Sequence, residues 1–217
     1  MEFYQRLLAA TQDAQATFHS APIIAAALEG NVTRALYLDF LEQAFHHVRH
    51  TVPLLMACGS RLPAHMEWLR VAVAHYIEEE IGHHEWILND IHACGGDIAA
   101  IRQGKPRLET EVMVAYAYDL ITRRNPVGFF GMVFVLEGSS VQLASQLAHT
   151  LGQHLALPPV AFSYLSSHGA LDMQHIEDFR HLVNQLESPA DQQAVIHAAE
   201  VFFRLYGDVI RSIGTER

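Results

Sequence analysis

The sequence has few of the features that mark secreted or membrane proteins. It contains only two cysteines, Cys58 and Cys94, without CxxC spacing, so a disulfide scaffold is excluded. Its longest uncharged apolar stretch, Pro126 to Leu136, is too short to span a bilayer. The N-terminus lacks the apolar run of a signal peptide. We therefore expect a cytoplasmic protein with no membrane partner.

Basic residues are also scarce. Lys and Arg number 14 against 24 Asp and Glu, which gives a formal net charge of −10 at pH 7. Nucleic acids and anionic membranes both need a basic patch, so neither partner is expected. Half of the residues are apolar and 18% are charged, an ordinary globular composition. A chain of this length can bury its own core, and we expect one domain over residues 1–217.

The chain shows no strand-like alternation, whereas helical periodicity recurs in nearly every segment. The predicted fold class is therefore all-α, a single-domain helical bundle. Cys94-Gly95-Gly96 is a typical helix end, and Ser188-Pro189 a typical helix start. The expected helical segments are 2–17, 21–28, 33–57, 64–93, 97–103, 109–123, 125–155, 160–168, 168–186 and 189–213.

Histidine, by contrast, is abundant, with 15 in the chain. It is the commonest metal ligand in proteins. In the segment from Tyr76 to Leu88, YIEEEIGHHEWIL, the stripe expected to face the core includes Glu80 and His83. If the core-facing stripe is in fact shifted by one position, both side chains would instead face solvent.

Two further predicted helices also place acidic residues on an apolar stripe. Asp172 and His175 interrupt the stripe of Leu165 and Phe179, and Glu137 follows a long uncharged run. A buried carboxylate costs several kcal/mol unless it is paired or bound to metal. Because these stripes carry no basic residue, a bound cation is the natural compensation.

The pattern is that of a di-iron carboxylate bundle, in which acid-x-x-His pairs and lone carboxylates project from neighbouring helices. The segment 33–57 should supply the remaining ligand. It offers His50 first and His47 second, while His46 aligns with a more polar side. Nitrogen and oxygen ligands fit iron or manganese, and also zinc. We expect two iron ions, with the candidate ligands Glu80, His83, Glu137, Asp172, His175 and His50.

The order of these motifs, a lone ligand, then ExxH, then LEG, then HxxxDxxH, resembles the heme-oxygenase-like di-iron oxidases and oxygenases. Their superfamily also includes TenA-type thiaminases, the pyrroloquinoline-quinone synthase and true heme oxygenases. The resemblance covers about residues 30–185. It implies a homodimeric enzyme that activates O₂ at non-heme iron and acts on a small organic substrate. It implies iron ligands and catalytic residues at Glu80, His83, Glu137, Asp172 and His175.

The resemblance is incomplete, because these enzymes have a glutamate on the helix at 33–57, where this chain has Arg49 or His50. Two other interpretations therefore stay open. His19, in TFHSAP, sits where a heme oxygenase has its proximal histidine, so the chain could bind heme. Alternatively, the inward acids and histidines could form a closed hydrogen-bond network in a metal-free, TenA-like binding or regulatory protein.

Overall fold

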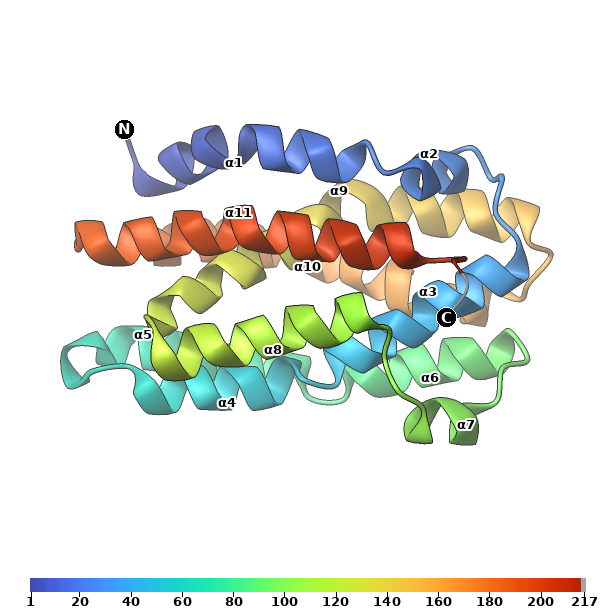
Figure 1. The fold of residues 1–217 in the computed structure, drawn as a ribbon, viewed down its shortest axis with the longest axis horizontal. Coiled ribbons are helices and arrows are strands. Elements are labelled where there is room, and N and C mark those ends of the chain that lie inside the picture. Colours follow the sequence, from blue (N-terminus) through green and yellow to red (C-terminus); the bar gives the residue numbers. More distant parts are fainter. Residues whose placement is uncertain (216–217) are drawn as a thin grey trace.

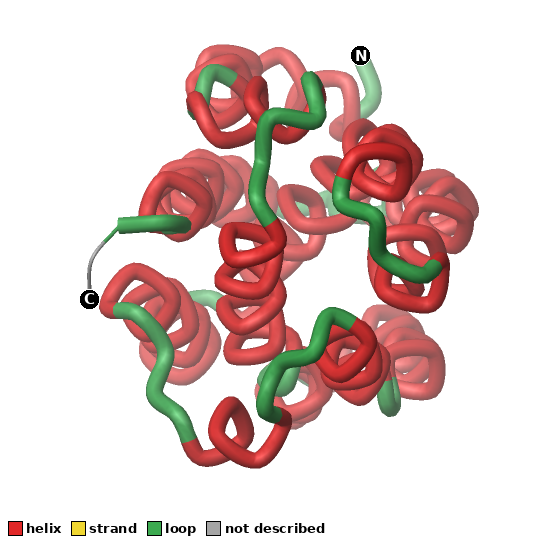
Figure 2. The backbone as a smooth tube through the Cα atoms, turned by 90° about the vertical axis from the view of Figure 1, so that its right-hand side faces the viewer, coloured by secondary structure: helices red, strands yellow, loops and turns green. Residues whose placement is uncertain are grey.

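The elements of the chain are helices throughout the part that is described (Figures 1 and 2). The computed structural model describes the backbone of residues 1–215 and, within it, all side chains except those of 142 and 168–175. The all-α bundle predicted from the sequence is confirmed. Its elements are α1 (Phe3–His19), α2 (Pro22–Leu28), α3 (Arg34–Val48), α4 (Thr51–Arg61), η1 (Ala64–Met66), α5 (Glu67–Glu80), α6 (His83–Ala93), α7 (Ile98–Gln103), α8 (Leu108–Arg123), η2 (Pro126–Phe129), α9 (Phe130–His154), η3 (Pro159–Phe162), α10 (Ser163–Val183) and α11 (Pro189–Ser212).

The long helix α9 organises the bundle, because it packs on α10, α11 and α2. Helix α1 lies along α11, α4 packs on α5 and α8, and α3 packs on α6 (Figure 1). The contact of α9 with α11 is close at Gly131, where a Cβ would lie 2.6 Å from the backbone nitrogen of Ala199. Helix α11 begins as the sequence predicts, with Ser188 Oγ accepting a hydrogen bond from Asp191 N and Pro189 in the first turn.

The expected single helix at 33–57 is wrong, because the chain breaks between α3 and α4 at Arg49 and His50. Pro53 explains the break. A proline has no N–H to donate, and its ring clashes with the carbonyl four residues earlier, which here belongs to Arg49. Pro53 is tolerated in the first turn of α4, where an N–H would have no helical partner.

The expected helix at 64–93 is also two helices, α5 and α6, separated by Ile81 and Gly82. Gly82 has a φ of +95°, in the left-handed region that side chains rarely adopt. The break falls between Glu80 and His83, so this acid-x-x-His pair spans two helices. Both helices keep the predicted inward stripe, with Tyr76 buried on α5 and His83 and Ile87 buried on α6.

The segments expected at 160–168 and 168–186 form the turn η3 and one helix, α10. Asp90 of α6 sets where α10 begins, because its carboxylate accepts hydrogen bonds from the backbone nitrogens of Ser163 (3.2 Å) and Tyr164 (2.9 Å). Helix α9 is bent. The segment Pro126–Val141, which begins with η2, meets the segment Leu143–His154 at an angle of 41°. Within the described residues, no single helix is long and apolar enough to cross a membrane, although this bent pair passes the same test of length and composition.

Candidate metal centre

A cavity of about 150 Å³ lies inside the bundle, walled by α3, α4, α5, α9, α10 and α11. Buried apolar side chains form two core clusters, and residues of both line the cavity, among them Phe129 from the first and Leu165 from the second. Most of the wall is apolar. Two carboxylates interrupt it, Glu80 at the end of α5 and Glu137 in the middle of α9. Two acids from separate helices therefore face one apolar cavity.

His83 lies beside Glu80 across the break between α5 and α6. Its Nδ1 is 3.1 Å from Glu80 Oε2, and its side chain is almost fully buried. The ring of Trp86 packs over the imidazole, with 4.1 Å between the ring centroids. The break thus leaves the pair in contact, and Trp86 fixes the orientation of the imidazole.

Tyr76 and Tyr206 are among the residues that line the cavity with these carboxylates. Burial raises the pKa of Tyr76 well above its usual value, and the negative charges of Glu137 and Glu79 raise it further. Burial also raises the pKa of Tyr206 to about 12. Both phenols therefore keep their protons at neutral pH.

The three histidines near the end of α3 point in different directions. His47 lines the cavity, with its ring edge-on to Tyr206 at 5.9 Å. His50 is not among the described lining residues. Its Nδ1 lies 3.1 Å from Tyr118 Oη, and burial, with a smaller effect of the neighbouring Arg49, lowers its pKa. His47 therefore occupies the position on the cavity wall that the sequence assigned first to His50.

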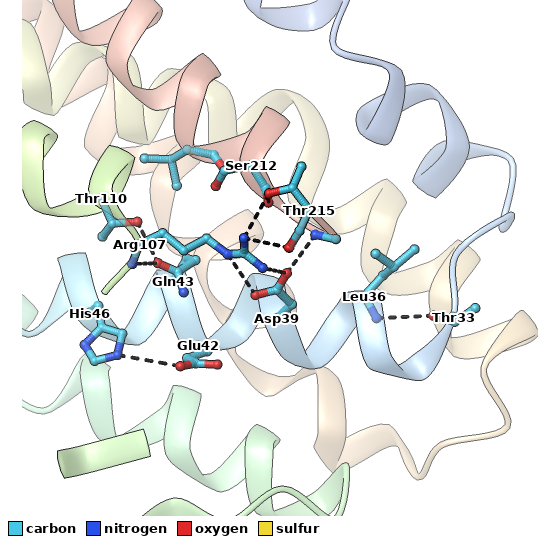
Figure 3. Close-up of polar contacts among 12 residues, drawn as sticks. Thr33, Leu36, Asp39, Glu42, Gln43, His46, Arg107, Thr110, Ser212 and Thr215 are labelled. Carbon is cyan, nitrogen blue, oxygen red and sulfur yellow. Dashed lines mark hydrogen bonds and ion pairs between the residues drawn. The ribbon is translucent and has the colours of Figure 1, made fainter. Parts of the chain in front are cut away.

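His46, the third alternative, lies 4.0 Å from Glu42 on another face of α3 (Figure 3). On a neighbouring face of the same helix, Asp39 pairs with Arg107 at 2.7 Å, and Arg107 also donates to the carbonyl of Thr215. Gly214 N donates to the same Asp39 carboxylate at 2.7 Å. These contacts fasten the last described residues and the start of α8 to α3, which carries His47.

The side chains of His168, Asp172 and His175 on α10 lie outside those described, so their part in the ligand set stays a prediction. Among the described side chains, no group of three His, Cys, Asp or Glu could hold a metal ion. The described acids Glu80 and Glu137 supply oxygen donors to the cavity, and His47 a nitrogen donor, which are donor types that suit iron.

The histidine of the heme interpretation and the two cysteines lie elsewhere. His19, at the end of α1, packs against Phe18 with 5.4 Å between ring centroids, and burial lowers its pKa. It is not among the described residues that line the cavity. Cys58 and Cys94 are buried, and burial raises the pKa of their thiols to about 12 and about 11. Neither thiol has the ionised character of a catalytic nucleophile.

Sequence reasoning missed two polar residues that matter here. Asp90 falls seven residues after His83, on the same face of α6, and is completely buried. Ser139 follows Glu137 by two residues and lines the cavity. The stripe that revealed His83 continues through Ile87 to Ile91 and passes over Asp90, which is buried beside it. Ser139 had no comparable signal, because a serine interrupts an apolar stripe less visibly than an acid does.

Comparison with known proteins places this architecture in a family. The sequence profile of the iron-containing redox enzymes matches residues 38–207. A domain of unknown function with a heme-oxygenase-like fold from Shewanella denitrificans OS217 superposes with a TM-score of 0.86 at 21% identity, covering 98% of this chain and 92% of that one. No curated protein matches the sequence.

Heme oxygenase and TenA structures share the fold. Heme oxygenase from Leptospira interrogans superposes with a TM-score of 0.79 at 15% identity, covering 98% of this chain and all of that one. A TenA homologue from P. horikoshii OT3 has a TM-score of 0.81 at 8% identity, with 98% of each chain covered. At such identities the likeness concerns the fold alone. The profile match over most of the chain shows that this protein belongs to the family of iron-containing redox enzymes, with a heme-oxygenase-like fold.

Proposed function

We propose that this protein is a non-heme iron oxidase or oxygenase that activates O₂ against a small organic substrate. The observation that carries the proposal is the convergence of Glu80 and Glu137, from separate helices, on one apolar cavity. No Lys or Arg is among the described lining residues, and the undescribed side chains at 142 and 168–175 include neither type. Two carboxylates that converge on an apolar wall with no Lys or Arg along its described part favour a bound cation.

The residues that would hold iron are those of the sequence prediction, with His47, its second choice on this helix, now preferred to His50. They are Glu80, His83, Glu137, Asp172, His175, and His47 or His50. Iron, when bound, supplies the electrons that reduce O₂ and an open coordination position for it. Manganese would suit the same donors, whereas zinc would bind them without redox chemistry.

The protein's own groups prepare the cavity for this chemistry. The apolar walls exclude water from the reacting groups. Tyr76 keeps its proton on Oη close to Glu137, where it can donate a hydrogen bond but carries no charge. A proton on His83 Nδ1 would be directed at Glu80 Oε2, and in that tautomer Nε2 is the acceptor nitrogen that would bind a metal.

Heme-dependent activity is the second candidate, because heme oxygenases share the fold over nearly the whole chain. Heme would need an axial ligand, and His19 is the histidine the resemblance suggests. The two carboxylates at the cavity wall favour non-heme iron over heme, because heme iron has no role for them.

Metal analysis separates the candidates. We would express the full chain in iron-supplemented medium and measure iron, manganese and zinc per chain by mass spectrometry. The non-heme proposal expects about two equivalents of iron, at least half of it lost in Glu80→Ala and Glu137→Ala. Glu85→Ala is the matched control, because Glu85 is an exposed acid on α6 that pairs with Arg102. The proposal fails if the wild type holds no iron or if the Glu80 and Glu137 variants retain all of it.

The other outcomes are equally distinct. Heme uptake with a Soret band that disappears in His19→Ala would establish the heme enzyme. A colourless protein whose unfolding temperature is unchanged by chelators would establish a metal-free binding protein. Comparing His47→Ala with His50→Ala identifies the ligand from this region, and we expect only the His47 variant to lose iron, because only His47 lines the cavity.

A further inference from the structure

A second, smaller cavity adjoins the first. It measures about 80 Å³ and lies between α2, α3, α9 and α11. The two cavities share five wall residues, Ile24, Phe40, Leu147, Leu165 and Ile210. Every described residue of the second cavity is apolar except Tyr37, whose hydroxyl donates to the carbonyl of Ala161 at 2.9 Å. The second cavity therefore extends the first with a wall that offers no free polar group.

Helix α9 runs along both cavities, from the first to the second. Glu137 and Ser139 line the first cavity, Leu147 lines both, and Leu151, further along the helix, lines only the second. At 1.5 Å per residue, Ser139 and Leu151 are about 18 Å apart along the path of α9, which bends between them. The polar end of this space is thus at Glu137 and Ser139, and the apolar end is near α2.

Ser139 is the unusual residue of the polar end. Its side chain is only 5% exposed, and its Oγ has no hydrogen-bond partner in the described part of the chain. The other buried Ser and Thr hydroxyls among the described residues, those of Thr11, Thr110 and Ser212, all make hydrogen bonds. A buried hydroxyl without a partner is costly, and a ligand group in the cavity would satisfy it.

The charge of the wall restricts what this ligand group can be. Glu80 and Glu137 would repel an anion, and no Lys or Arg lines either cavity among the described residues. The undescribed side chains at 142 and 168–175, within the bundle, include no Lys or Arg either. A substrate carboxylate or phosphate at Ser139 would therefore find no counter-charge from Lys or Arg, and the charge of bound iron would already be largely offset by the acids that hold it.

We propose that the substrate is an uncharged, elongated and mainly apolar molecule, which hydrogen-bonds to Ser139 Oγ through one polar group and extends its apolar part along α9 into the second cavity. This inference rests on the proposed function, because it takes the cavity of Glu80 and Glu137 as the reaction site. A dry apolar cavity of about 150 Å³ accommodates benzene, so the two cavities together hold about nine non-hydrogen atoms. A medium-length aliphatic alcohol has this size and polarity.

Binding of 1-octanol to the full chain tests the proposal, with octanoate and octylamine as the charged comparisons. We would measure affinities by calorimetry, both on the protein as isolated and after removal of metal by a chelator. We expect 1-octanol to bind the chelated protein at least tenfold more tightly than octanoate. Ser139→Ala should weaken 1-octanol binding about fivefold, the loss expected for one neutral hydrogen bond. Ser145→Ala, on an exposed face of the same helix, should leave it unchanged.

The apolar end has its own test, which does not depend on Ser139. Ala27 lines only the second cavity, so Ala27→Phe should weaken 1-octanol binding at least tenfold and leave 1-butanol binding unchanged. Equal or tighter binding of octanoate to the chelated protein, unchanged affinity in Ser139→Ala, or equal effects of Ala27→Phe on both alcohols would each overturn the proposal. Iron content is measured separately. Selective binding of 1-octanol to a protein that retains no iron would refute the proposed function and leave this inference standing.

Discussion

Replacing Asp90 with alanine would remove the group that anchors the start of α10. The Asp90 carboxylate is fully buried and accepts three hydrogen bonds, two from the backbone nitrogens of Ser163 and Tyr164 and one from the Ser163 hydroxyl. Each donor left without a partner costs about 1–3 kcal/mol. Since Ser163 and Tyr164 are half-buried and water can reach them in part, the lower value applies. We expect Asp90→Ala to lower the free energy of unfolding by about 3 kcal/mol.

Asp90→Asn should cost less, about 1 kcal/mol, because the amide keeps one acceptor oxygen. Burial raises the pKa of Asp90, because a negative charge is disfavoured at this position. The uncharged asparagine removes that cost. Asp97 provides a matched control, because it caps α7 through Ala99 N and Ala100 N at an exposed site. Asp97→Ala should cost about 1 kcal/mol.

Urea denaturation followed by circular dichroism measures all three variants. The loss of unfolding free energy should be largest for Asp90→Ala and smaller for Asp97→Ala and Asp90→Asn. The slope of the unfolding free energy against urea concentration should be the same in all three variants. A loss below about 0.5 kcal/mol for Asp90→Ala would refute this expectation, since a buried cap of three hydrogen bonds cannot be removed at so small a cost. Because α10 carries Asp172 and His175, we also expect Asp90→Ala to retain less iron.

Three further outcomes are expected. Gly131→Ala should destabilise the protein by about 1–3 kcal/mol in urea denaturation, because the new Cβ would meet the backbone of α11. Gly138→Ala should stabilise it by about 1 kcal/mol, because a Cβ there would meet nothing within 4 Å. Equal effects of the two substitutions would contradict the packing of α9 on α11. Neither Cys58 nor Cys94 should react with a thiol reagent at pH 8 in the native state, since burial raises both pKa values, and fast labelling of either would disprove its burial. Because burial lowers the pKa of His50, the native state binds its proton less readily than the unfolded state. Stability should therefore fall as the pH drops below about 6.5, and less so in His50→Gln, as urea midpoints at pH 7.5 and 5.5 would show.

The fold was largely predictable because helical periodicity is a local property of the sequence. The start of α11 at Ser188 and Pro189 follows from capping preferences alone. The two broken helices were missed because the apolar stripe continues across each break. Pro53 is a local signal that identifies the first break, and Gly82 marks the second, although a glycine within a helical pattern is weaker evidence.

The candidate site was less accessible to sequence reasoning. Periodicity assigns Glu80 and Glu137 to inward stripes, but it cannot say that the two stripes meet at one cavity. Which of His47 and His50 lines the cavity depends on the turn at Arg49, after which His50 lies beside Tyr118. Asp90 acts on a helix 73 residues away in the chain, and no local pattern reveals such a partner.

The separation of α5 from α6 has a mechanical consequence. In a continuous helix, side chains three residues apart are held about 5–6 Å from each other at their Cβ atoms. Glu80 and His83 are instead joined through Ile81, which is largely exposed, and Gly82, around which a Cβ would meet nothing within 4 Å. Their spacing is therefore set by the torsion angles of two unconfined residues. A change in those angles would alter the separation of the carboxylate and the imidazole without unwinding a turn of either helix.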